Sequence, residues 1–242
     1  LHSLQNFLNE SAVGLVEVPN FDFMLKNGMY SEFTTDHIFY FTEKTLRTVL
    51  ETHGFDVIEI HAAHGYLVHQ FLSPITNQRT DEFGGSIEKR AKYLVDIVKG
   101  IREAVGEEIP ISVRFSATDY RDDGFTVEQC AEVAKLCEAV GADVFDISSG
   151  GLVLGVQIPF GPGYQVPMAN DVAEEVSSPV AAVGLITDSK QAEDILKTTN
   201  VEIIMIGRLS LRDPYWPLRA AHELGVEINY WPNQYIRGTY PA

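Results

Sequence analysis

Short apolar runs alternate with longer segments of helical periodicity along most of the chain. The runs are typical of buried strands and start near residues 56, 111, 143, 180 and 201. Between them, apolar residues recur at helical spacing, most clearly in the segment that Ser86 opens and Gly106 ends. Short apolar strands separated by amphipathic helices imply parallel strands joined by crossover helices. The pattern therefore predicts an α/β fold with a parallel sheet.

Polar residues mark the starts of the predicted helices. Thr126 and Gln129 have the spacing of a capping box, in which each side chain satisfies a free amide at the helix start, and this helix is predicted to run to Gly141. Thr187 is predicted to cap a shorter helix after the strand at 180–183. These caps set the predicted order of strands and helices in the middle of the chain.

Both ends of the chain continue this alternation. Asp213 is predicted to cap a helix that has Pro214 at its first position and Gly225 as its stop. Near the start, residues 12–18 resemble a sixth strand, and a helical stretch follows Thr34-Thr35 and ends at Gly54. An open doubly wound sheet is the alternative architecture, but the chain shows no Gly-rich first turn of the type that such a sheet carries.

Composition narrows the class of protein. The 242 residues suit one α/β barrel domain, and no apolar run reaches the ~18–20 residues that a membrane helix needs. Eighteen Lys and Arg against 34 Asp and Glu give a formal charge of −16, which argues against a nucleic-acid partner. Cys130 and Cys137 are seven residues apart on a predicted helix, about 10 Å between Cα atoms, so we expect two buried free thiols in a reducing cytoplasm.

Chemistry-bearing residues gather where the predicted strands end. In a barrel, catalytic groups lie at the C-terminal ends of the strands. His61, His64 and Tyr66 follow the first clear strand at spacings that let their side chains converge on one small polar group. The alternative is that the histidines are structural. The two histidines could also be zinc ligands, but no third ligand of the right type lies nearby in the sequence, so we expect no metal.

Two arginines and two glycines indicate an anion site. Arg114 lies within a predicted strand, where a buried guanidinium needs an anionic partner such as Asp119, another carboxylate or a bound anionic cofactor. Gly184 and Gly207 end the last two strands, where barrels commonly bind phosphate; the alternative is that both are simple turn glycines. Arg208 directly after Gly207 favours phosphate, because a guanidinium can bind it bidentately.

Taken together, these segments resemble the Old Yellow Enzyme family, and closely its bacterial-type NADPH dehydrogenase branch. The resemblance covers roughly residues 50–238, and its most specific part runs from His61 to Ser86. The matching segments are Gly54 to Leu67, Gln70 to Pro74, Asn77 to Ser86, Arg114 to Ser116, Ser148 to Gly150, Gly184 to Thr187, Ile206 to Arg208 and Leu211 to Pro214.

The resemblance implies a role for each of the candidate substrate residues. His61 and His64 match the pair that hydrogen-bonds the carbonyl or nitro oxygen of the substrate. Tyr66 matches the tyrosine that supplies a proton to the substrate's α carbon. Arg237 matches a C-terminal arginine that reaches into a neighbouring subunit's active site, which implies a homo-oligomer. The implied substrates are α,β-unsaturated carbonyl or nitro compounds, whose activated C=C bond is reduced.

The resemblance also implies the cofactors. Arg114 matches the arginine beside the pyrimidine ring of FMN, where positive charge stabilises the anionic reduced flavin. Gly184, Gly207 and Arg208 match the residues that bind the FMN phosphate. NADPH, or NADH, is the implied hydride donor, and the implied protein is a cytoplasmic flavoprotein with small-molecule partners and no membrane partner.

The chain departs from the family at its N-terminal end. The family's fold is a TIM (β/α)8-type barrel, and this chain offers five or six of the eight strands. We therefore expect an atypical segment at 1–32 and a barrel at 33–242 that lacks its first two or so βα units, with their flavin contacts. Together with the start at Leu1, this favours a fragment or a mispredicted start; a natural short form that closes by oligomerising is the other account.

Two other functions compete with the ene-reductase. One is a catalytically inactive barrel remnant without stable FMN binding, because part of the flavin site is missing. The other is a dienoyl reductase of the same wider family. That enzyme needs an iron–sulfur cluster held by several cysteines, whereas this chain has two, both in one predicted helix.

Overall fold

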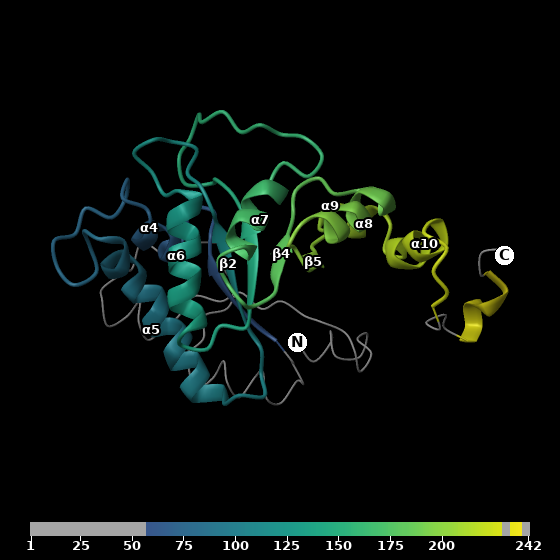
Figure 1. Cartoon of the computed structure of the whole chain (residues 1–242), viewed down its shortest axis with the longest axis horizontal. Coiled ribbons are helices and arrows are strands. Elements are labelled where there is room, and N and C mark those ends of the chain that lie inside the picture. Colours follow the sequence, from purple (N-terminus) through teal and green to yellow (C-terminus); the bar gives the residue numbers. More distant parts are fainter. Residues whose placement is uncertain (1–56, 229–232, 239–242) are drawn as a thin grey trace, which may run out of the picture.

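The computed structural model describes residues 57–228 and 233–238 (Figure 1). The expectations for 1–32, for the strand at 12–18 and for the helix that ends at Gly54 lie outside these residues. The described elements, in order, are β1 (Ile58–Ala62), α4 (Leu67–Leu72), α5 (Ile87–Val105), β2 (Ile111–Ser116), α6 (Val127–Glu138), β3 (Val144–Ser148), α7 (Val166–Ala173), β4 (Val180–Ala182), α8 (Ser189–Thr198), β5 (Ile203–Ile204), α9 (Arg208–Arg212), α10 (Trp216–Glu223) and the 3-10 helix η2 (Asn233–Gly238).

The five described strands form one parallel sheet in the order β1-β2-β3-β4-β5. Each strand pairs with the next one along the chain, which is the strand order of a (β/α) barrel and differs from the reversed order of a doubly wound sheet. The register places His61 beside Arg114, Arg114 beside Asp146 and Asp146 beside Ala181. One row across the sheet therefore carries an imidazole, a guanidinium and a carboxylate next to one another.

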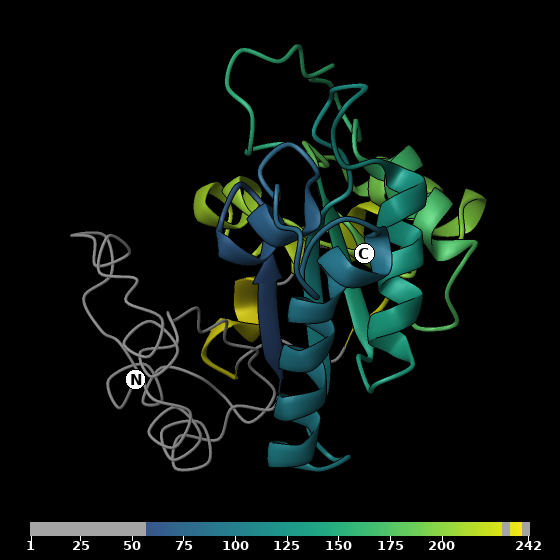
Figure 2. The same ribbon diagram turned by 90° about the vertical axis from the view of Figure 1, so that its left-hand side faces the viewer.

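The two faces of the sheet differ in polarity because side chains alternate along each strand. One face carries the buried residues Val113, Phe115, Phe145 and Ile147, which belong to a single hydrophobic core. The helices cover this face, and Figures 1 and 2 show α5 and α6 running side by side along it. Burial of each of these phenylalanines contributes about 2–3 kcal/mol. The opposite face carries the polar row.

Several predicted helix ends are confirmed and others are corrected. Helix α5 begins after Ser86 and ends at Gly106, whose φ of 76° only glycine adopts easily. Thr126 caps α6 by accepting the Gln129 N–H at 3.4 Å. The predicted capping box is incomplete, however, because the Gln129 side chain accepts a hydrogen bond from Arg90 instead. Helix α6 also ends at Glu138, three residues before the predicted stop.

The two predicted caps nearer the C-terminus are wrong. Asp188, not Thr187, caps α8, and its carboxylate accepts the Gln191 N–H at 3.0 Å. Asp213 ends the short helix α9 and pairs with Arg219 at 2.9 Å, so α10 starts only at Trp216 and Pro214 lies outside it. The sequence patterns did not predict α9. Because α9 ends directly before Asp213, Asp213 follows one helix and does not begin the next.

Strand positions agree with the predictions to within two residues, but β5 is limited to Ile203–Ile204. Helices α4 and α7 were also not predicted from the sequence. Cys130 and Cys137 are free and buried in α6, as expected, and burial raises the pKa of the Cys137 thiol to about 12. In the described part of the chain, no helix has the length and apolar character needed to cross a bilayer.

Candidate active site

The loop after β1 brings His61, His64 and Tyr66 together, as the sequence predicts. The ring centroids of His61 and His64 are 5.3 Å apart, and those of His61 and Tyr66 are 5.0 Å apart. A tight turn produces this arrangement. His64 and Gly65 have φ angles of 54° and 80°, and the Tyr66 N–H donates to the Ala63 carbonyl at 3.1 Å, as in a type I′ turn. Tyr66 remains 51% exposed, so its hydroxyl is open to a ligand.

Both imidazoles are neutral near pH 7. Burial, followed by the positive charge of Arg114, lowers the pKa of His61 and of His64 to about 4. His61 Nδ1 accepts the Ala63 N–H at 3.1 Å, so its single proton lies on Nε2. A neutral imidazole with its proton on Nε2 donates one hydrogen bond from that atom. His61 is therefore a fixed donor beside Tyr66.

Hydrogen bonds tie the turn to the ends of β2 and β3. The backbone N–H of His64 donates to Ser116 Oγ at 2.9 Å, and the Ser116 hydroxyl donates to the Gly150 carbonyl at 2.7 Å. His64 Nε2 lies 2.8 Å from Ser148 Oγ. The backbone of His64 is thus held by the end of β2 and its ring by the end of β3, which orients the imidazole before a ligand binds.

Arg114 has a carboxylate partner, but it is not Asp119. Its Nε lies 3.0 Å from Asp146 Oδ2 on the adjacent strand, in a geometry that makes an ion pair and not a regular hydrogen bond. Asp146 is 1% exposed, and burial raises its pKa to about 6; Arg114 opposes that shift and Glu59 adds to it. Asp119 instead contacts His69 behind the turn. Of the partners that the sequence left open, the structure gives a carboxylate other than Asp119, because strand register decides which one Arg114 meets.

A cleft at the C-terminal ends of the strands brings the other predicted residues into one place. It has a volume of about 330 Å³, and we call it the strand-end cleft. His64, Arg114, Gly184, Gly207 and Arg208 all line it. Gly184 has a φ of 130°, and a Cβ there would lie 3.1 Å from Gln165 Nε2 and from the Tyr164 ring. The backbone at Gly184 is thus exposed to the cleft only because this residue has no side chain.

The charge of the strand-end cleft is opposite to that of the whole chain. Its described lining contains Arg114, Arg208 and Arg212 and no aspartate or glutamate, although the chain has a formal charge of −16. Arg208 is the first residue of α9 and is exposed. Three guanidiniums without a lining carboxylate form a site for an anionic group, and their planar forks match phosphate or carboxylate.

Arg237 is the one predicted site residue that lies elsewhere. It is exposed on η2 and is not among the residues that line the strand-end cleft. Figure 1 shows η2 at the far end of the described chain, beyond α10. The described residues of one chain therefore do not bring Arg237 to the His61–Tyr66 turn.

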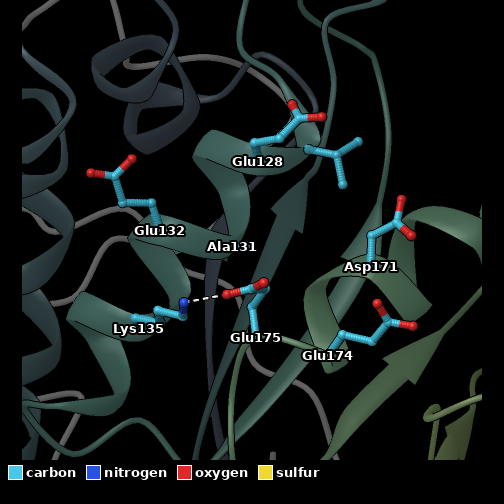
Figure 3. Close-up of a pocket in the computed structure, with 8 residues that line it drawn as sticks. Glu128, Ala131, Glu132, Lys135, Asp171, Glu174 and Glu175 are labelled. Atoms are coloured by element: carbon cyan, nitrogen blue, oxygen red, sulfur yellow. Dashed lines mark hydrogen bonds and ion pairs between the residues drawn. The ribbon is translucent and has the colours of Figure 1, made fainter.

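A second and larger hollow lies between α6 and α7 on the outside of the fold, and Figure 3 shows its lining. We call this hollow, of about 520 Å³, the acidic groove. Its lining carries one cation, Lys135, which pairs with Glu175. The other acidic residues in the lining are Glu128, Glu132, Asp171 and Glu174. No strand end contributes to the acidic groove, so its size alone does not make it the candidate site.

Sequence reasoning missed several residues that shape the site. Gln165 is buried, accepts a hydrogen bond from Ser149 at 2.5 Å and donates to the Val183 carbonyl at 2.9 Å, which joins the β3 and β4 loops. His69 is fully buried on α4 and accepts the Gly65 N–H. No signal in the sequence indicated His69, because the helix that carries it, α4, was not predicted. Gln165 gives no signal either.

Comparisons with known proteins agree with this geometry. The sequence profile of the NADH:flavin oxidoreductase / NADH oxidase family matches residues 10–227, so the chain belongs to that family. It is 48% identical over 185 residues to an NADPH dehydrogenase of Geobacillus thermodenitrificans (strain NG80-2), an alignment that covers 76% of this chain and 53% of that protein. The chain thus spans about half the length of the curated relatives it matches.

Solved structures extend the likeness to the fold. A 2-naphthoyl-CoA reductase bound to 2-naphthoyl-CoA superposes with a TM-score of 0.64 at 32% identity, covering 72% of this chain and 27% of that chain. The old yellow enzyme from Trypanosoma cruzi superposes with a TM-score of 0.59 at 21% identity, covering 77% of this chain and 46% of that chain. These comparisons confirm the resemblance to the Old Yellow Enzyme family and the TIM-barrel type of fold.

Proposed function

We propose that this chain acts as an FMN-dependent NAD(P)H oxidoreductase that reduces the activated C=C bond of α,β-unsaturated carbonyl or nitro compounds. The observation that carries the proposal is the strand-end cleft, in which three arginines and the neutral His64 line one space, with the neutral His61 next to His64. Family membership and the NADPH dehydrogenase relatives support FMN as cofactor and NADPH as hydride donor.

The residues of the cleft fit FMN. Arg208, with the backbone of Gly184 and Gly207, would hold the phosphate, because a guanidinium and open backbone amides are good donors to a dianion. Arg114 would lie beside the ring system, where its charge favours an electron-rich flavin. When bound, FMN supplies hydride transfer between the nicotinamide and the alkene.

The turn after β1 would bind and activate the substrate. His61 donates from Nε2, and with His64 it would hold the carbonyl or nitro oxygen of the substrate. Hydrogen bonds to that oxygen withdraw electron density, which makes the β carbon electrophilic. The exposed Tyr66 hydroxyl would give its proton to the α carbon. Both histidines are neutral, so they polarise the oxygen without competing as proton donors.

A neighbouring copy of the chain is part of this proposal. Arg237 is exposed on η2 and lies outside the cleft of its own chain. A homo-oligomer in which Arg237 enters the partner's cleft would add a further cation to the substrate side. Sedimentation of the chain at micromolar concentration tests this, and a monomer would contradict the role of Arg237.

The absorption spectrum of the full chain tests the proposed function. The protein is mixed with FMN, desalted, and then titrated under nitrogen with NADPH and with 2-cyclohexenone. We expect a retained flavin band that NADPH bleaches and cyclohexenone restores. A colourless protein after desalting would overturn FMN binding and favour an inactive remnant. A bleached band that cyclohexenone leaves unchanged would overturn the substrate class.

A further inference from the structure

A fully buried histidine lies directly behind the turn that carries the candidate substrate residues. His69, on α4, is 0% exposed and does not line the strand-end cleft. Its Nδ1 accepts the Gly65 N–H at 3.0 Å. Its Nε2 lies 3.1 Å from Asp119 Oδ1, a charge contact without the geometry of a regular hydrogen bond. The His69 ring therefore bridges the backbone of the turn and a buried carboxylate.

The chemistry of Asp119 determines which nitrogen of His69 is the acceptor. Asp119 Oδ2 accepts the Ser73 hydroxyl at 2.6 Å and the Phe125 N–H at 2.8 Å. Burial would raise the pKa of Asp119, but the contact with His69 and these hydrogen bonds outweigh it and hold the pKa below its usual value. An ionised carboxylate beside Nε2 favours a proton on that nitrogen. Nδ1 is then free to accept from Gly65.

The turn needs such support because its conformation is strained. His64 has a φ of 54°, which costs a residue with a side chain about 1–2 kcal/mol. Its neighbour Gly65 cannot be replaced easily, since a Cβ there would lie 2.7 Å from the Gly151 carbonyl oxygen. A rotation of the Gly65 peptide would relieve the strain. It would also shift His64 and Tyr66, which flank that peptide, relative to His61, whose ring both of them contact.

We propose that His69 is a positioning residue, which Asp119 orients so that its Nδ1 accepts the Gly65 N–H and fixes the turn that aims His64 and Tyr66. His69 does not line the strand-end cleft and acts only through the backbone of the turn. The catalytic consequence rests on the proposed function, because it assumes that His64 and Tyr66 act on the substrate. The effect on the turn itself does not.

Two substitutions of similar size separate this role from simple core packing. In His69→Asn the side-chain oxygen takes the place of Nδ1 and can still accept from Gly65. In His69→Gln the longer amide takes the place of Nε2, so it keeps the contact with Asp119 and loses the one with Gly65. Amide hydrogen exchange of Gly65, measured by NMR on the full chain without added ligand, reads the turn directly.

We expect the Gly65 amide to exchange roughly tenfold faster in His69→Gln than in His69→Asn, the difference made by one hydrogen bond. With FMN and NADPH present, kcat for cyclohexenone should be lower in His69→Gln than in His69→Asn by a similar factor. The two variants should retain FMN equally. Equal Gly65 exchange in the two variants would overturn the proposal, because packing alone would then explain His69.

A third variant tests the proposal even if His69→Gln fails to fold. Asp119→Asn leaves His69 in place but removes the charge that keeps its proton on Nε2. We expect faster Gly65 exchange and a change in the ¹⁵N shift of His69 Nδ1; unchanged values for both would contradict the proposal. The two proposals can fail separately. If Gly65 exchanges faster in His69→Gln than in His69→Asn but the wild type reduces no alkene, the proposed function fails and the role of His69 in the turn stands.

Discussion

The strand-end cleft and the acidic groove show how position and charge together define a site. The acidic groove is the larger hollow, yet only two helices form it and five of its eight lining residues are acidic. The strand-end cleft is smaller, but residues in the C-terminal half of, or just after, each of the five described strands line it, and it carries three arginines without a lining carboxylate among the described residues. Volume alone would select the wrong hollow. The strand-end cleft is identified as the candidate site by its positive charge and its position at the strand ends.

The same comparison limits what net charge can say. A formal charge of −16 suggests a surface that repels anions. The arginines of the strand-end cleft place positive charge at one position, which favours a bound phosphate there. The carboxylates of the acidic groove repel one another in solvent, where the cost is small. We therefore expect large effects from changes in the strand-end cleft and small ones in the acidic groove.

Arg208→Ala is expected to have the largest effect on FMN binding. Loss of one charged hydrogen-bonding group corresponds to about 1.5–3 kcal/mol, or roughly a 10–100-fold weaker Kd. Lys135→Ala removes the same charge from the acidic groove and should leave the Kd unchanged. Flavin fluorescence titrations of both variants measure this, and equal losses would break the comparison.

Gly184→Ala is expected to lower the free energy of unfolding by about 2 kcal/mol, because the backbone strain of a non-glycine residue adds to the contacts at 3.1 Å. Gly155 also has a positive φ, 76°, but nothing lies within 4 Å of its Cβ position. Gly155→Ala therefore measures the strain alone, about 1 kcal/mol. Urea unfolding compares the two; an equal loss would mean that the wall of the cleft adapts freely.

The two regions should respond to acid with opposite signs. The pKa of His61 and His64 is about 4 in the folded chain and 6.5 in the unfolded one, so the unfolded state takes up more protons between these values. Their contribution to stability is present above pH 6.5 and is lost as the pH falls toward 4. In the acidic groove, burial and then Glu174 and Glu128 raise the pKa of Asp171, so falling pH relieves repulsion there.

Urea unfolding at pH 7 and pH 5 checks the sign for the histidines. The wild type should lose more stability between these pH values than the double variant His61→Asn, His64→Asn. Asp146 has the opposite effect on stability. Its pKa is raised to about 6, so its contribution to stability falls as the pH rises from 3.8 to 6. A double variant that loses as much stability as the wild type would contradict the lowered pKa values.

Asp171→Asn should have the smallest effect. It removes one of the five carboxylates of the acidic groove and with it part of the repulsion from Glu174 and Glu128. An exposed charge interaction of this kind contributes about half a kcal/mol or less. We expect a slight rise in the free energy of unfolding and no change in FMN binding. A loss of FMN would show that the acidic groove belongs to the site.

Much of the site follows from the sequence because the ends of parallel strands meet at one edge of a sheet. That rule put Arg208 with Gly184, whereas close spacing after one strand placed His61, His64 and Tyr66 together; the structure confirms both groupings. Helix α5 was also predictable, since Ser86 and Gly106 are local signals that no distant residue overrides.

The parts that could not be predicted depend on residues that are distant in sequence. Arg114 pairs with Asp146 because of strand register, and Asp119 is held by His69 from a helix that the sequence patterns did not reveal. Gln129 leaves its capping box because Arg90, 39 residues earlier, offers a stronger donor. Each of these partners follows from tertiary packing, which a single sequence does not display.

The most direct test of the central claim, that the strand-end cleft is an anion site for FMN, compares FMN with riboflavin. The two flavins differ only in the phosphate, and their fluorescence reports binding to the full chain. We predict that FMN binds at least about tenfold more tightly than riboflavin, the difference made by one charged hydrogen-bonding group, and that Arg208→Ala removes most of this preference. Equal affinity of the wild type for FMN and riboflavin would contradict the assignment of Gly184, Gly207 and Arg208 to the phosphate.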